Sequence, residues 1–186
     1  MAKVYIFLAD GYEEIEGLTV VDLLRRAGID ISMVSITGNK YVTGAHQITS
    51  ETDELFDEAD FKDADMLVLP GGMPGTTHLM EHEGLDKLLK NFNAKGKPLA
   101  AICAAPSVLG VKGLLNGKNA TCYPGNEDKL IGAHIINTAV VADGNIITSK
   151  GMGTAIDFSL FLIKSIKGEE EAIRIANKIQ YQHYVL

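Results

Sequence analysis

The sequence predicts an α/β protein in which a mostly parallel sheet lies between two layers of helices. Short, nearly uninterrupted apolar runs alternate along the chain with longer segments of helical periodicity. This alternation is typical of parallel sheets that helices cover on both faces. Of the 186 residues, 46% are hydrophobic and 22% charged, which suits a sizeable core. The sequence contains no repeat, low-complexity tract or linker, so residues 1–186 are expected to form one domain.

The strands are predicted from the apolar runs, because a strand buried on both faces has few polar positions. Buried strands are expected over residues 4–8, 31–36, 66–69 and 99–102. A hairpin-like insertion is expected over residues 41–50, and a last pair of strands over 139–141 and 146–148. Asp143-Gly144 joins that pair as a tight-turn signal.

The helices are predicted from apolar side chains that recur every three or four residues. Residues 13–27 place Ile15, Leu18, Val21 and Leu24 on one face, and Gly28 follows as a plausible C-cap. Three further helices are expected over residues 85–92, 155–166 and 169–180. The carboxyl ends of the strands, at residues 9–11, 70–72 and 103–105, should converge on one crevice, where ligands of open α/β sheets bind.

Cys103 is the candidate nucleophile at this crevice. It stands between a buried strand and a helix start that contains Pro106, so the turn should hold it in a sparsely populated backbone conformation. The positive end of the helix dipole is expected to lower the pKa of its thiol. The alternative is a buried, inert cysteine, which is how we interpret Cys122.

Gly71-Gly72 and Glu16 are the candidate partners of this thiol. Paired glycines let backbone N–H groups approach an oxyanion, although the same pair also suits a turn without a ligand. Glu13 and Glu14 are interpreted as solvated residues that complement the helix dipole. Glu16 lies near the apolar stripe and should point inward, where a protonated carboxyl could donate a hydrogen bond to the sulfur and titrate with it as a coupled pair.

Composition and motifs argue against several classes of function. The formal net charge of -7 without a basic cluster disfavours nucleic acid and anionic membranes. No apolar run resembles a signal peptide or a transmembrane helix, which favours the cytoplasm. The segment from His78 to His82 matches H-x-x-E-H, but without a third ligand we interpret it as a solvated helix and expect no metal. The other histidines, His46, His134 and His183, are expected at the surface or in packing.

Four segments together resemble the DJ-1/ThiJ/PfpI superfamily, and most closely its DJ-1 branch and bacterial relatives. They are GYEEIE at 11–16, LPGG at 69–72, AICAAP at 101–106 and TSKGMGT at 148–154. The resemblance implies a flavodoxin-like fold, similar to class I glutamine amidotransferases, and a homodimer. It also implies that Cys103 is the nucleophile, Glu16 its protonated partner, and the N–H groups of Gly72 and Ala104 the oxyanion site. Tyr123 occupies the position where the DJ-1 branch commonly has a histidine.

The resemblance implies a cofactor-free enzyme of the glyoxalase or deglycase type, acting on methylglyoxal-like dicarbonyls or their protein adducts. The alternative is a redox-sensing or chaperone-like protein in which Cys103 is oxidised to a sulfinate. Peptidase activity is disfavoured, because the protease branch has a histidine directly after the cysteine and this chain has Ala104. The sequence leaves open whether the apolar tail, residues 181–186, packs on the domain or at a subunit interface.

Overall fold

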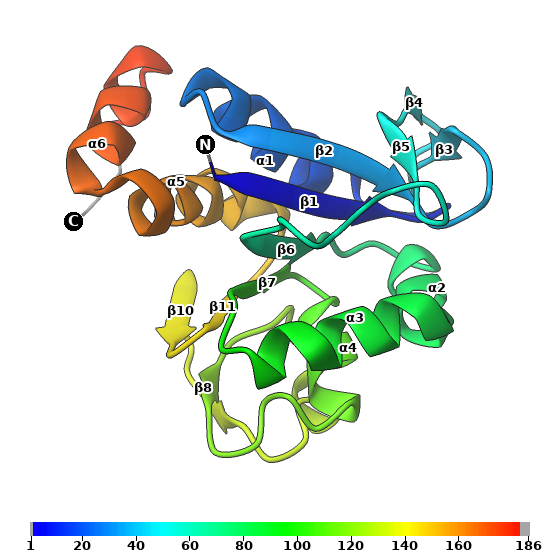
Figure 1. The fold of residues 1–186 in the computed structure, drawn as a ribbon. Coiled ribbons are helices and arrows are strands. Elements are labelled where there is room, and N and C mark those ends of the chain that lie inside the picture. The colour runs from blue at the N-terminus through cyan, green and yellow to red at the C-terminus, as the bar shows by residue number, and fades with distance from the viewer. Residues whose placement is uncertain (1, 183–186) are drawn as a thin grey trace.

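The computed structural model describes residues 2–182, and a seven-stranded sheet forms its centre (Figure 1). Its strands are β1 (Lys3–Leu8), β2 (Asp30–Ser35), β5 (Glu54–Leu55), β6 (Met66–Leu69), β7 (Leu99–Ile102), β10 (Val140–Asp143) and β11 (Ile146–Ser149). They lie in the order β10-β11-β7-β6-β1-β2-β5. β10 and β11 pair antiparallel, whereas the other neighbours pair in parallel. The prediction of a mostly parallel sheet is confirmed.

Helices cover both faces of this sheet, as the sequence predicts. They are α1 (Glu14–Arg26), α2 (Gly75–Glu81), α3 (Glu83–Ala94), α4 (Pro106–Val111), α5 (Ala155–Lys167) and α6 (Glu169–Lys178). One apolar cluster joins the sheet to α1, α5 and α6, and a second joins the opposite face to α2, α3 and α4. Strand β1 shows why its sequence is apolar throughout, since Val4, Ile6 and Leu8 face the first cluster while Tyr5 and Phe7 face the second.

The remaining elements are short and lie at the margins of the sheet. The predicted hairpin is present as β3 (Tyr41–Thr43) and β4 (Thr49–Glu51), which pair antiparallel. A second small sheet contains β8 (Asn119–Ala120) and β9 (His134–Ile135). Two 3₁₀ turns cover Glu127–Lys129 and Met152–Thr154.

The carboxyl ends of β1, β6 and β7 meet at one place, as expected. β1 lies between β2 and β6, so the connections after β1 and β6 lead to opposite sides and leave a crevice at the ends of these strands. The N–H of Glu13 donates to the carbonyl of Gly71 at 2.9 Å, which joins the β1 and β6 loops. A Cβ placed on Gly71 would lie 2.6 Å from Cys103 Cβ, which brings the β7 loop to the same point.

The sequence predicts no transmembrane helix and leaves open where the C-terminal tail packs. Within residues 2–182, no helix combines the length and the apolar character needed to cross a bilayer. In the tail, the Tyr181 hydroxyl donates to the carboxylate of Asp157 in α5 at 3.0 Å. The rest of the tail, residues 183–186, lies outside the described part of the chain.

Candidate active site

Cys103 follows the last residue of β7 in a left-handed backbone conformation, with φ +66°. Its N–H donates to the Ser149 carbonyl in β11 at 2.9 Å, and its own carbonyl accepts from the Tyr123 N–H at 2.8 Å. Helix α4 begins three residues later, with Pro106 in its first turn. The predicted strained turn between strand and helix is therefore present. The side chain is half-buried, whereas Cys122 is buried.

Glu16 projects from the first turn of α1 and is completely buried. Its Oε2 accepts a hydrogen bond from the Gly71 N–H at 2.9 Å. Its Oε1 is buried and has no hydrogen-bond partner among the described residues. The Cys103 thiol interacts with the carboxyl, but not in the geometry of a full hydrogen bond. Glu16 thus points inward as expected, with one oxygen held and the other free beside the sulfur.

The two glycines after β6 bring backbone close to this pair. A side chain on Gly71 would lie 2.7 Å from Glu16 Oε2 and 2.6 Å from Cys103 Cβ, so only glycine leaves the acid and the thiol in place. Gly72 has φ +91°, and a side chain there would collide with the backbone of Gly11 and Glu13. The N–H groups of Ala104 and Gly72 interact with the Cys103 sulfur and favour its thiolate. The structure therefore brings all these predicted residues together.

Burial dominates the titration of both acidic groups. It raises the pKa of Glu16 to about 7, against the interaction with the Cys103 thiol and the hydrogen bond from Gly71. Burial, together with the charge of an ionised Glu16, also raises the pKa of Cys103, and the N–H groups of Ala104 and Gly72 only partly offset this. The N–H groups thus act on the thiol pKa in the expected direction, but the expected net lowering is wrong, because burial and Glu16 outweigh them. Because the two groups cannot both ionise near neutrality, they share one proton above about pH 7.

Tyr123 lies beside this pair, at the position where the family resemblance implies a histidine. A Cβ built on Gly151 would lie 3.2 Å from Tyr123 Cδ2 and 3.9 Å from Cys103 Sγ. The ring and the sulfur therefore both lie beside the space above the Gly151 Cα. The ring is 53% exposed. Its neighbour Cys122 is buried, and burial raises the pKa of that thiol to about 11.

The interpretation of Glu14 as a solvated residue is wrong. Its side chain is 3% exposed, and Oε1 accepts from the N–H groups of His46 and Ile48 at 2.8 and 3.3 Å. His46 Nδ1 lies 3.0 Å from Glu14 Oε2 and 3.5 Å from Glu13 Oε2. Glu13, Glu14 and His46 therefore form a possible metal-binding group. Among the described residues, their potential ligand atoms all lie within 4.8 Å of one another. The bonds of Glu14 to the hairpin already give the cluster a structural role.

The H-x-x-E-H segment does not form such a group in the described structure. His78 Nδ1 lies 3.0 Å from the carbonyl of Asp10. His82 is the N-cap of α3, where its Nδ1 accepts from the Leu85 N–H at 3.0 Å. Burial lowers the pKa of His82. His78 is exposed, as expected for a solvated helix, whereas His82 is half-buried and caps α3.

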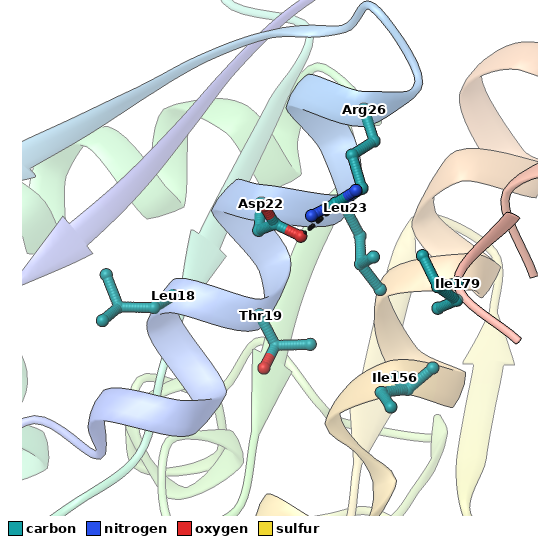
Figure 2. Close-up of a pocket in the computed structure, with 7 residues that line it drawn as sticks. All are labelled: Leu18, Thr19, Asp22, Leu23, Arg26, Ile156 and Ile179. Carbon is teal, nitrogen blue, oxygen red and sulfur yellow. Dashed lines mark hydrogen bonds and ion pairs between the residues drawn. The ribbon is translucent and has the colours of Figure 1, made fainter. Parts of the chain in front are cut away.

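A separate hollow of about 480 Å³ lies between α1, α5 and the end of α6 (Figure 2). Its lining consists of Leu18, Thr19, Asp22, Leu23, Arg26, Ile156 and Ile179. The two charged members, Asp22 and Arg26, are paired with each other at 2.5 Å. The hollow contains no nucleophile and shares no residue with the Cys103 site.

Known proteins with similar sequences and structures identify the family. Residues 2–165 match the model of the DJ-1/PfpI family. The chain is 37% identical over 179 residues to Protein DJ-1 homolog B of Arabidopsis thaliana, which covers 95% of this chain and 41% of that protein. The chain thus spans less than half the length of this plant relative. It is 31% identical over 167 residues to a protein of Pyrococcus abyssi named a deglycase, covering 89% of this chain and 99% of that one.

The structure agrees with the sequence comparison. Toxoplasma gondii DJ-1, in a structure described as oxidized, superposes with a TM-score of 0.94 at 34% identity, covering 98% of this chain and 100% of that one. The flavodoxin-like arrangement implied by the sequence motifs is confirmed, and the chain belongs to the DJ-1/PfpI family.

Proposed function

We propose that the protein is a cofactor-free, cysteine-dependent enzyme of the glyoxalase or deglycase type. Its substrates would be 2-oxoaldehydes such as methylglyoxal, or the early adducts that these form with proteins. The observation that carries the proposal is the meeting of Cys103, Glu16 and two backbone N–H donors around Gly71. This arrangement supplies a nucleophile, a proton carrier and an oxyanion site within one crevice.

Each group has one part in the proposed reaction. The Cys103 thiolate adds to the aldehyde carbon of methylglyoxal and forms a hemithioacetal, whose oxygen accepts from the N–H groups of Gly72 and Ala104. Glu16 first gives its proton to this oxygen, and the resulting carboxylate takes the proton from the former aldehyde carbon and returns it to the neighbouring carbon. The hydroxyl proton passes to the oxygen on that neighbouring carbon, which gives a thioester of the hydroxy acid. Water hydrolyses the thioester, releases lactate and restores the thiol. One carbon is oxidised and its neighbour reduced, so no external oxidant is needed.

The bonding of Glu16 supports its role as the neutral partner of a thiolate. Oε2 accepts a hydrogen bond from Gly71, whereas Oε1 has no donor among the described residues. An unprotonated carboxylate would leave Oε1 buried without compensation, which is unfavourable. A proton on Oε1 can instead be donated to the sulfur, which also accepts from Ala104 and Gly72. We therefore place the shared proton on Glu16.

A redox role is the second candidate. Toxoplasma gondii DJ-1 has been solved in a form described as oxidized, and Cys103 is more accessible than Cys122. A sulfinate at Cys103 would accept hydrogen bonds from the protonated Glu16 and from the same N–H groups. Mild peroxide followed by mass spectrometry tests this role, which fails if Cys103 is modified no faster than Cys122.

The enzymatic proposal is tested by the conversion of methylglyoxal to lactate without added cofactor. We expect Cys103→Ser and Glu16→Gln each to lower kcat/KM by a factor of about 100 or more, since both remove a group that acts on the substrate. Cys122→Ala is the matched control and should retain turnover. Wild-type turnover no faster than that of Cys103→Ser would refute the proposal.

We also propose that the chain works as a homodimer. Ile15 in α1 and Ile48 beside the hairpin are 51% and 55% exposed, and large exposed apolar side chains are common at interfaces. Sedimentation equilibrium is the test, and a purely monomeric protein at micromolar concentration would contradict this assignment.

A further inference from the structure

The Tyr123 ring and the Cys103 sulfur both lie beside Gly151. The ring carbon Cδ2 and the sulfur are 3.2 and 3.9 Å from the point where Gly151 would carry a Cβ. A carbonyl carbon bonded to the sulfur would therefore place its neighbouring substituent within reach of this ring. The ring is half-exposed, so it borders the path by which a substrate approaches.

The position of the ring is set by the surrounding backbone. The Tyr123 N–H donates to the Cys103 carbonyl at 2.8 Å, and the Tyr123 carbonyl accepts from the Asn126 N–H at 3.2 Å. Gly151 is held in turn, because its carbonyl accepts from the Thr154 N–H at 2.8 Å and its own N–H donates to Thr154 Oγ1 at 3.2 Å. The absence of a side chain on Gly151 lets the ring lie close to the thiol.

Two methionines and one acidic residue lie beside the residues of the site. Met73 directly follows Gly72 and is 58% exposed, and Met152 directly follows Gly151 and is 51% exposed. Glu13 is close enough for its charge to act on Glu16. A substrate with a negative charge beside its carbonyl would be repelled by the thiolate and by this carboxylate, which His46, 3.5 Å from Glu13 Oε2, compensates only in part. The surroundings therefore favour an uncharged, apolar substituent.

We propose that Tyr123 determines substrate specificity by contacting the substituent next to the reacting carbonyl. The preferred class is the uncharged 2-oxoaldehydes with a planar apolar substituent, such as phenylglyoxal, over methylglyoxal and over anionic aldehydes such as glyoxylate. An aromatic side chain offers a large apolar face and stacks on a planar group. This inference rests on the proposed function for its reaction, but the contact itself can be measured without turnover.

The test is the ratio of kcat/KM for phenylglyoxal to kcat/KM for methylglyoxal. Tyr123→Ser removes the ring and should lower this ratio by about tenfold, since a lost apolar contact reduces discrimination by roughly that factor. Tyr123→Phe keeps the ring and should keep the ratio. Tyr41→Ser removes a tyrosine of similar exposure, 59%, from strand β3, and should leave the ratio as in the wild type.

Alanine substitutions at Gly151 and Gly153 provide a second, matched test of the same kcat/KM ratio. Gly151→Ala places a methyl group 3.2 Å from the ring carbon, so the ring must move away, and the ratio should change several-fold. Gly153→Ala adds the same methyl group two residues later, where no atom lies within 4 Å, and should behave as wild type. Equal effects of these two substitutions would overturn the assignment.

A binding measurement separates failure of this inference from failure of the proposed function. Each aldehyde should protect Cys103 from iodoacetamide by forming a reversible hemithioacetal, which mass spectrometry follows at Cys103 alone. If no aldehyde is turned over but phenylglyoxal still protects more strongly, and Tyr123→Ser abolishes that preference, then the proposed function fails and the contact stands. If Tyr123→Ser leaves the protection ratio unchanged, the specificity role is wrong.

Discussion

Cys103 combines a strained backbone with a buried acidic partner, and only the first of these is a local property. The left-handed φ of +66° follows from a turn that passes directly from strand to helix, a pattern visible in a short stretch of sequence. The direction of its pKa shift depends on Glu16, Gly72 and the burial of the site. Those residues come from segments far apart in the chain, which explains why the sequence predicts the position of the thiol but not its titration.

The shared proton gives a prediction for Glu16→Gln. A carboxylic acid donates a stronger hydrogen bond to a thiolate than an amide does, so the variant should raise the midpoint pH of Cys103 alkylation. We expect an increase of about 0.5 to 1 unit, which corresponds to about 0.7 to 1.4 kcal/mol. Iodoacetamide labelling rates between pH 5 and pH 10 measure the midpoint. A lower midpoint in the variant would mean that wild-type Glu16 is the ionised member of the pair.

Gly71 gives a second prediction at the same scale. Gly71→Ala places a Cβ 2.6 Å from Cys103 Cβ and 2.7 Å from Glu16 Oε2, so the acid and the thiol must separate. We expect a loss of stability of about 1–3 kcal/mol from overpacking, together with slower alkylation of Cys103. Urea denaturation and labelling rates provide the two measurements. Gly153→Ala, which meets no atom within 4 Å, is the control, and equal behaviour of the two variants would contradict the geometry.

At the scale of elements, the β3–β4 hairpin fixes the start of the helix that carries Glu16. The Gly11 N–H donates to the Thr43 carbonyl, and the Ala45 N–H to the Tyr12 carbonyl, both at 2.8 Å. The buried carboxylate of Glu14 accepts two further backbone N–H groups from the loop between the strands. The hairpin is thus bonded to the segment just before and within the first turn of α1.

Removing this carboxylate should loosen the hairpin. Glu14→Ala leaves the N–H groups of His46 and Ile48 without their acceptor, and we expect a loss of about 2–3 kcal/mol. His46→Gln should lose less, because both backbone bonds remain. Burial would raise the pKa of Glu14, but its bonds to the His46 side chain and to backbone N–H groups outweigh burial and lower it below the usual value of 4.5. The difference between wild type and Glu14→Ala in urea denaturation should therefore shrink as the pH falls below about 4.5.

The elements that the sequence predicts well are those whose apolar pattern is long or continuous. The four predicted helices and the central strands are present within a few residues, because each buries a face that its own sequence displays. Strands β5, β8 and β9 contain two residues each and carry no periodicity of their own. The prediction that Glu14 is solvated fails for a related reason, since nothing in the sequence of α1 reveals that residues 41–51 fold back over this side chain.

At the scale of the whole molecule, the packing of the sheet against its helices excludes water from the carboxyl group of Glu16. Glu16 is completely buried at the carboxyl end of a sheet whose two faces are covered by separate apolar clusters. Such a carboxyl is tolerated more easily when it is neutral. The position of the proposed proton carrier is therefore also one where ionisation opposes folding.

This opposition predicts the pH dependence of global stability. Burial raises the pKa of Glu16 from 4.5 to about 7, so between these values the native state holds a proton that the unfolded chain has lost. The stability from the Glu16–Cys103 pair is therefore fully present below about pH 4.5 and falls as the pH rises to about 7, where the folded pair loses its first proton, by roughly 3 kcal/mol in total. In Glu16→Gln the side chain keeps its shape but has no ionisable proton, so the stability of this variant should not decline in the same way as the pH rises.

Urea denaturation of both proteins at pH 5 and pH 8 measures the effect, because the other titrating groups are common to the two chains and cancel in the difference. The variant should gain stability relative to wild type as the pH rises from 5 to 8, even though it has lost the proposed proton carrier. Parallel stability curves for the two proteins would show that Glu16 is already ionised at pH 5, and a neutral acid could then no longer be the partner of the Cys103 thiolate.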